Sequence, residues 1–113
     1  MSESIVETAK IRALNDDFRI LGRGHGSILI TEGIQALGEL SVIRIVLAIR
    51  EYDNFNQDND PWNEHDFGSL MIGEHNVFFK IDYYDRNIQA ASSNPADGDV
   101  THRALTIMLA DEY

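Results

Sequence analysis

Apolar and polar side chains alternate along residues 76–84, and this alternation constrains the fold more than any other feature of the chain. Successive side chains of a β-strand point to opposite faces of the sheet. One face of the predicted strand, which we expect to lie in the core, carries Val77, Phe79, Ile81 and Tyr83. The opposite face carries Phe78, Lys80, Asp82 and Tyr84. A second strand is predicted over residues 67–72, and the short connection "GEH" joins the two as a hairpin.

Two segments have the spacing of three and four residues that is typical of amphipathic helices. The first covers residues 4–21, ends before Gly22, and has an apolar stripe formed by Ile11, Leu14, Phe18 and Leu21. The second covers residues 41–54, and its stripe consists of Val42, Ile45, Ile49 and Tyr52. Its apolar arc is widened further by Ile43, Val46 and Leu47. This width has two interpretations: a central helix, or a helix with one flank that pairs with a second copy as a homodimer.

The remaining segments complete a single predicted α+β domain over residues 1–113. Ile28, Leu29 and Ile30 are contiguous, so residues 27–31 predict a short strand that is buried on both faces and central or covered. Residues 86–99 have loop composition. Asp97 or Asp99 caps a predicted final helix that runs to about residue 111, with a stripe of Leu105, Met108 and Leu109. The predicted order is α, β, α, β, β, α, with three helices packed on a small, mostly antiparallel sheet.

The charge of the chain is divided unevenly. Residues 1–50 contain six acidic and six basic side chains, so residues 51–113 carry the whole net charge of −10. Such a field repels nucleic acid and anionic membranes, and it attracts cations or basic protein surfaces. We therefore expect no direct nucleic-acid or membrane binding.

Two further properties of the composition limit the chemistry. The chain has no cysteine, which excludes disulfides and thiolate metal ligands and fits a reducing compartment. No apolar run approaches the roughly 18 residues that a membrane span needs. We expect a soluble, cytoplasmic protein, and no feature of the sequence calls for a cofactor.

Four separated motifs appear in order along the chain: "NDDFR" at 15–19, "NDPWNEHDFG" at 59–68, "KIDYYD" at 80–85 and "LTIMLADEY" at 105–113. Together they resemble the domain of unknown function 3768 family, and the resemblance runs from about residue 10 to the end. That family is uncharacterised, so the resemblance implies no activity. It implies a bacterial setting, with an association to plasmids, phages and other mobile elements.

The acidic segment, residues 51–66, contains six acids and no Lys or Arg. An EF-hand loop that starts at Asn56 needs glycine where Pro61 stands and glutamate where Phe67 stands, so this calcium motif fails twice. A divalent-metal or hydrolytic site remains an alternative, centred on His65, Asp66, Asp82 and Asp85 and with His102 as a further candidate ligand. A carboxylate pair such as Glu64 and Asp82 is a further catalytic alternative.

A docking surface is the third interpretation of the acidic segment, and it accounts for the whole charge asymmetry. Carboxylates spread over a folded surface imitate a run of phosphates and attract a Lys- and Arg-rich groove. The predicted contact residues are Glu51, Asp53, Asp58, Asp60, Trp62, Glu64, Asp66, Asp82, Tyr84 and Asp85. Trp62 is either a contact residue for a partner or an anchor that holds the segment to the domain's own core.

The leading hypothesis from the sequence is an acidic, non-enzymatic interaction module. Its expected partner is a basic, nucleic-acid-handling protein complex, such as a restriction or CRISPR-type defence complex, which it would bind and inhibit. The alternative is a divalent-metal-dependent enzyme or ion-binding protein centred on His65, Asp66, Asp82 and Asp85. A homodimer formed through the helix at 41–54 is a separate expectation.

Overall fold

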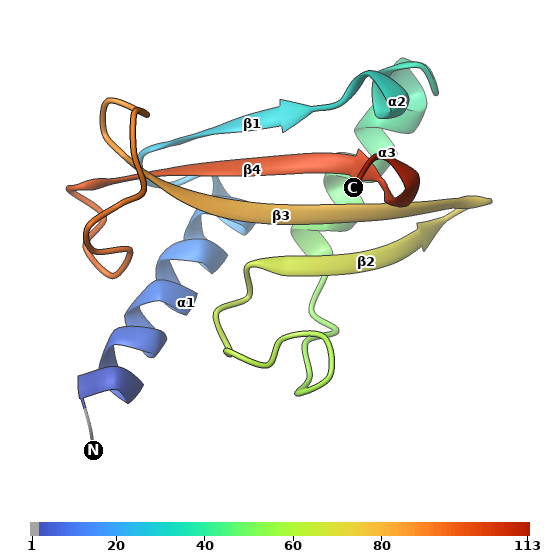
Figure 1. Cartoon of the computed structure of the whole chain (residues 1–113). Helices are drawn as coiled ribbons and strands as arrows, with labels where there is room; N and C mark the ends of the chain where they lie inside the picture. Colours follow the sequence, from blue (N-terminus) through green and yellow to red (C-terminus); the bar gives the residue numbers. More distant parts are fainter. Residues whose placement is uncertain (1–2) are drawn as a thin grey trace.

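The computed structural model describes residues 3–113 as one sheet with helices against one of its faces (Figure 1). The helices are α1 (Glu3–Leu21), α2 (Glu32–Gln35) and α3 (Glu39–Glu51), followed at the C-terminus by the 3₁₀-helix η1 (Ala110–Glu112). The strands are β1 (Gly26–Ile30), β2 (Phe67–Ile72), β3 (His75–Asp85) and β4 (Thr101–Leu109). The fold class is therefore α+β, as predicted.

The sheet is mixed. Its strand order is β1-β4-β3-β2, with β1 parallel to β4 and the other two pairs antiparallel. The hairpin of β2 and β3 is confirmed, and its register places Phe67 opposite Lys80 and Ile72 opposite His75. The predicted core face of β3 is also confirmed, because Val77, Phe79 and Ile81 are buried against the helices.

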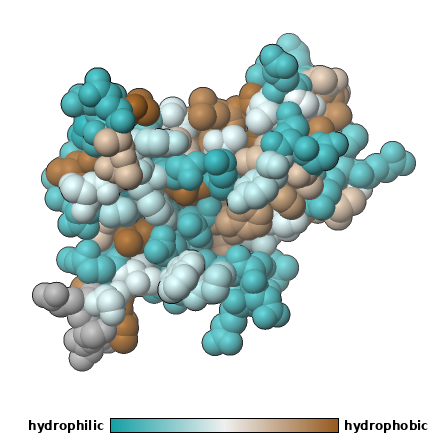
Figure 2. Space-filling model, in the orientation of Figure 1, coloured by the Kyte–Doolittle hydropathy of each residue, from teal (hydrophilic) through white to brown (hydrophobic). Residues whose placement is uncertain are grey.

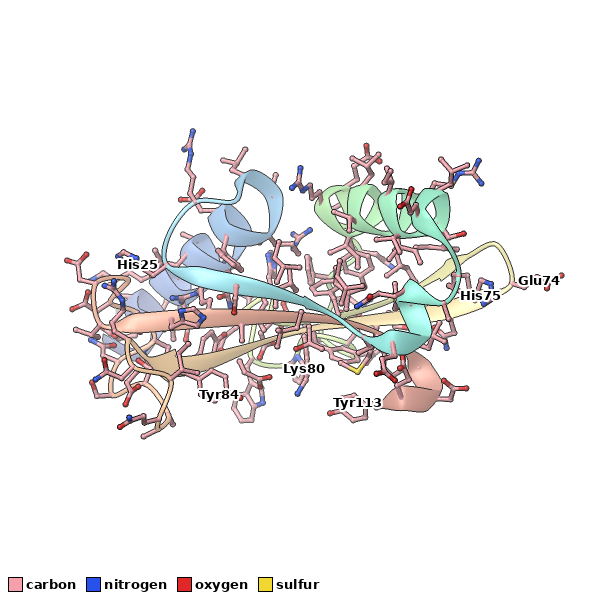
Figure 3. The ribbon with its side chains drawn as sticks, turned by 90° about the horizontal axis from the view of Figure 1, so that it is seen from above. His25, Glu74, His75, Lys80, Tyr84 and Tyr113 are labelled. Carbon is pink, nitrogen blue, oxygen red and sulfur yellow. The ribbon has the colours of Figure 1, made fainter. Side chains whose placement is uncertain are left out.

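Helices α1 and α3 cover one face of the sheet and leave the other open. Seen from above, both helices lie on one side, while Lys80, Tyr84 and Tyr113 lie on the opposite side (Figure 3). The covered face holds the core, in which Phe18 of α1 and Ile45 and Ile49 of α3 pack on the strands. Helix α3 begins two residues before the predicted position and ends three residues earlier, and Leu21 at the end of α1 is exposed.

The predicted final helix is wrong: residues 101–109 form the strand β4. Thr101, Arg103, Leu105 and Ile107 alternate along the covered face and are all buried. The charge of Arg103 hid this alternation, because a cation breaks an apolar pattern unless its partner is known. Ala104 and Met108, on the other face, are buried too, so the strand lacked the clean two-residue period that identified β3.

The expectation of a central, covered position for residues 27–31 is also wrong. Strand β1 lies at the edge of the sheet, and Ile28 and Leu29 are 43% and 52% exposed. A contiguous apolar run indicates a strand with both faces covered only if each face has a neighbouring layer. At this edge neither side chain has a neighbour from the described residues that buries it.

No helix within residues 3–113 combines the length and the apolar character that crossing a bilayer requires.

Candidate functional site

The acidic segment links the end of α3 to the start of β2 and projects below the sheet (Figure 1). Asparagine side chains hold its turns. The side-chain oxygen of Asn56 accepts hydrogen bonds from the backbone N–H groups of Asp58 and Asn59, and Asn59 donates to the carbonyl of Asn54 at 2.7 Å. Asparagine and aspartate favour such local bonds to the backbone. The segment is therefore an ordered series of turns.

Asp60 is the one carboxylate of the acidic segment that is buried, with 6% exposure. It accepts hydrogen bonds from the backbone N–H groups of Glu64 and His65 at 3.2–3.3 Å. Asn63 and His65 have φ angles of 57° and 58°, so this carboxylate stabilises a turn that bends through the left-handed region. Asp60 thus holds the segment together and is not on the exposed surface where the sequence placed it.

His65 joins the acidic segment to α1. Its Nδ1 lies 2.9 Å from a carboxylate oxygen of Asp16, and its ring stacks on Phe55 at a centroid distance of 3.9 Å. The guanidinium of Arg12 in α1 makes a second link, because it donates a hydrogen bond to the carbonyl of Asn63 at 3.0 Å. Two points of α1 therefore fix the segment's position beside the helix.

A buried polar network lies beneath these contacts. Asn15 of α1 is fully buried and donates to the carbonyl of Glu64 at 2.9 Å and to the Tyr83 hydroxyl at 2.7 Å. Tyr83 donates in turn to the Glu64 carboxylate at 2.8 Å, and Arg103 Nε donates to the Asn15 side-chain oxygen at 2.6 Å. Every member has a partner, as buried polar groups require. The network connects α1, β3, β4 and the acidic segment.

Burial shifts the pKa values of two members of this network, Tyr83 and Arg103, and of the neighbouring Asp66. It raises the pKa of the Tyr83 hydroxyl well above its ordinary value and lowers the pKa of the Arg103 guanidinium. Burial also raises the pKa of the Asp66 carboxyl, and the neighbouring charge of Glu64 adds to that shift. Tyr83 therefore stays a neutral hydrogen-bond donor at physiological pH.

Arg19 anchors the start of the acidic segment. Its guanidinium donates to the carbonyls of Ile49 at 2.6 Å and Tyr52 at 2.9 Å, which terminate α3, and it lies within 5.5 Å of the ring centroids of Phe55 and Phe79. A cation is favourable at a helix C-terminus and over an aromatic ring. Asn15, Arg19 and Arg103 belong to the site although their sequence positions did not predict it. For Asn15 a signal existed, since it lies four residues after Ile11, on the apolar stripe of the helix.

Trp62 projects from the acidic segment into solvent, with 76% of its surface exposed. The interpretation of Trp62 as an anchor in the protein's own core is therefore wrong. Glu51, Asp53 and Asp58 are also exposed. The space-filling view shows a mostly hydrophilic surface over the projection below the sheet (Figure 2). The segment thus combines an exposed indole with exposed carboxylates.

Asp82, Tyr84 and Asp85, the predicted contact residues on β3, each have a different environment in the structure. Asp82 pairs with Lys80 at 3.0 Å on the open face of the sheet, and this hydrogen bond raises the pKa of Lys80. Tyr84 lines a groove on that open face. The Asp85 carboxylate accepts a hydrogen bond from the backbone N–H of Gln89. Asp82 and Asp85 therefore have local partners, and the acidic segment supplies the exposed carboxylates.

The residues of the metal alternative are not gathered into one site. His65 is held by Asp16, Asp82 by Lys80, and Asp85 by a turn N–H. Within residues 3–113, no group of three or more His, Asp or Glu side chains is arranged to hold a metal ion.

The open face of the sheet carries a groove of about 710 Å³. Ser27 Oγ lies 3.0 Å from His102 Nε2 on its floor, a pairing that resembles a nucleophile and its base. A working triad also needs a group that orients the imidazole. The pair joins the neighbouring strands β1 and β4, and in the described part of the chain no carboxylate bonds to the other nitrogen of His102.

Comparison with known proteins identifies the family. The model of the family described as "Protein of unknown function (DUF3768)" matches residues 30–112. The chain therefore belongs to this family. No curated protein and no solved structure matches the chain.

Proposed function

We propose that this chain is an acidic, non-enzymatic interaction module that binds and inhibits a basic, nucleic-acid-handling protein complex. Bacterial restriction and CRISPR-type defence complexes are the partner class that we favour, and the bacterial cytoplasm is the compartment in which the module would meet them. The contact surface consists of Glu51, Asp53, Asp58, Trp62 and Asp66. Tyr84 belongs to the separate groove on the open face.

The exposure of Trp62 carries this proposal. Tryptophan is among the residues most enriched at the energetic centres of interfaces, because one side chain buries a large apolar area and offers an N–H donor. Here 76% of it lies in solvent, on a segment that α1 holds in place through His65 and Arg12. A rigid indole loses little conformational entropy when a partner covers it.

The charge distribution supports a basic partner. Residues 51–113 carry the whole net charge of −10, and the acidic segment contains six of their acids without a base. Long-range attraction between opposite potentials speeds the encounter of two proteins and selects against acidic surfaces. A groove that normally holds nucleic-acid phosphates has the complementary potential.

Capture from a bacterial lysate tests the proposal with two variants of equal charge. The first carries Glu51→Gln, Asp53→Asn and Asp58→Asn in the acidic segment. The matched control carries Asp97→Asn, Asp99→Asn and Asp111→Asn, which are exposed carboxylates elsewhere in the acidic half. We expect the first variant to lose a nucleic-acid-handling partner that the wild type and the control retain at low salt.

High salt separates the outcomes further. Screening weakens attraction between exposed charges, so we expect wild-type capture to fall at molar salt. Equal capture by all three proteins at every salt concentration would refute the proposal, as would recovery of partners that are all acidic.

A further inference from the structure

Within the described residues 3–113, strand β1 has no neighbouring strand on one side, and this side is its free edge. Strand β1 ends the strand order β1-β4-β3-β2, and it bonds to β4 through odd-numbered residues: the carbonyl of His25 accepts from Arg103, and the N–H of Thr31 donates to Ile107. Backbone groups of a strand point alternately to its two sides. The N–H and C=O groups of Gly26, Ile28 and Ile30 therefore face away from the sheet.

This edge has little of the protection that natural sheet edges have. Exposed edge strands usually carry charged residues, proline or a bulge that prevents pairing with another chain. The sequence of β1, "GSILI", contains no charge and no proline. Gln35 covers one of the outward carbonyls, that of Ile30, at 2.7 Å. Ile28 is 43% exposed, and within residues 3–113 no turn, loop or side chain is a hydrogen-bond partner of its outward backbone groups.

Helix α3 continues the apolar surface beside this edge. Besides the stripe that packs in the core, α3 has a second stripe, in which Leu40, Ile43 and Leu47 are 72%, 55% and 50% exposed. Ile43 and Ile30 line the same groove of about 440 Å³. The end of β1 and the second stripe of α3 thus adjoin at Ile30 and Ile43, and monomeric proteins rarely expose large apolar surfaces without a partner.

The charge distribution indicates which partner fits. Residues 1–50, which include β1 and nearly all of α3, are neutral in sum, and the acidic half begins at residue 51. The acidic segment leads into β2, at the edge opposite β1. Two copies that meet at β1 keep their acidic segments at the far ends of the joined sheet. Contacts between two acidic halves would bring together two surfaces that each carry a net charge of −10, and these would repel each other.

We propose that β1 pairs antiparallel with β1 of a second copy, so that the two sheets become continuous. Antiparallel pairing of identical strands is two-fold symmetric, which makes the contact self-complementary and closed. Centred on Ile28, it forms two reciprocal hydrogen bonds between the Ile28 residues. The free edge of β1, on which the pairing rests, plays no part in the proposed docking of the acidic segment, and the two proposals share the charge distribution alone.

Sedimentation velocity at micromolar concentration tests the pairing. The wild type is expected at twice the 12.8 kDa mass of the chain. Ile28→Lys places a charge at the centre of the strand contact. This variant is expected to sediment as a monomer with an unchanged circular dichroism spectrum, since the Ile28 side chain is 43% exposed and lies outside the core.

Met71→Lys is the matched control, because Met71 is an exposed apolar residue on the opposite edge strand, β2. It is expected to remain a dimer. Salt should strengthen the wild-type dimer by screening repulsion between the acidic halves, the reverse of its effect on capture of a basic partner. A monomeric wild type, or a dimer that Met71→Lys disrupts and Ile28→Lys does not, would overturn the inference.

Discussion

Asn15 is a single residue on which several elements depend. Its amide links α1 to the acidic segment, to Tyr83 and to Arg103. Asn15→Ala leaves Arg103 Nε without its buried acceptor, while the bond from the guanidinium to the Pro95 carbonyl remains. We expect the free energy of unfolding to fall by roughly 2–3 kcal/mol. Urea denaturation measures this change. Asn87→Ala, at an exposed position, should stay within about 0.5 kcal/mol of the wild type, and equal losses for both variants would contradict the role of Asn15.

Two aspartates of the acidic segment offer a comparison of identical substitutions. Asp60→Asn removes a buried charge that accepts hydrogen bonds from two backbone N–H groups, so we expect a loss of about 1–2 kcal/mol in unfolding free energy. Asp58→Asn, at an exposed position, should leave stability unchanged. Conversely, Asp58→Asn should weaken partner capture and Asp60→Asn should affect capture only through stability. Thermal unfolding and capture, measured on the same two variants, separate the two roles.

Asp66 makes the stability of the folded protein depend on pH. Its pKa is raised in the folded protein, mainly by burial, so the folded state holds the proton more tightly than the unfolded chain does. Stability contributed by this group is therefore lost as pH rises through the folded pKa, and it is regained as pH falls. Asp66→Asn should raise the melting temperature at neutral pH, with a difference that shrinks in acid. A constant difference at all pH values would show that Asp66 is not the titrating group.

At the level of secondary structure, β2 depends on the absence of a side chain at Gly68. A Cβ at that position would collide with the ring of Phe79 and contact Tyr52. We expect Gly68→Ala to cost about 1–3 kcal/mol through overpacking, while Ser69→Ala, at the exposed next position, should be nearly neutral. Denaturant midpoints of the two variants provide the measurement, and a neutral Gly68→Ala would imply that the hairpin can move away from the core.

Elements with one clear period were predictable from the sequence, and elements whose pattern depends on tertiary partners were not. β2, β3 and α1 were located to within one residue, because the alternation of β3 and the spacing in α1 reflect one buried face each. β4 was misread, because a buried cation interrupts its covered face. The burial of Arg103 becomes intelligible only beside Asn15 and Tyr83, which lie far away in the sequence.

Across the whole molecule, the one strand of the neutral half, β1, and the acidic segment lie at opposite edges of one sheet. The neutral half supplies β1 and α3, and the acidic segment precedes β2 at the far edge. The charge asymmetry could be predicted from the sequence, but which carboxylates are exposed and which are buried could not. Asp58 and Asp60 are two residues apart, and only the turn geometry decides that one faces solvent and the other is buried.

The most direct test of the account is the dissociation constant of the complex with the captured partner, measured for the wild type and for Trp62→Ala over a range of salt concentrations. We predict that Trp62→Ala raises the dissociation constant by about 30-fold, the effect of losing an interfacial hot spot worth ~2 kcal/mol. We also predict that salt weakens both complexes. Trp62→Ala should fold like the wild type, because its side chain is mostly in solvent. A dissociation constant that neither the substitution nor salt changes would contradict docking through the acidic segment.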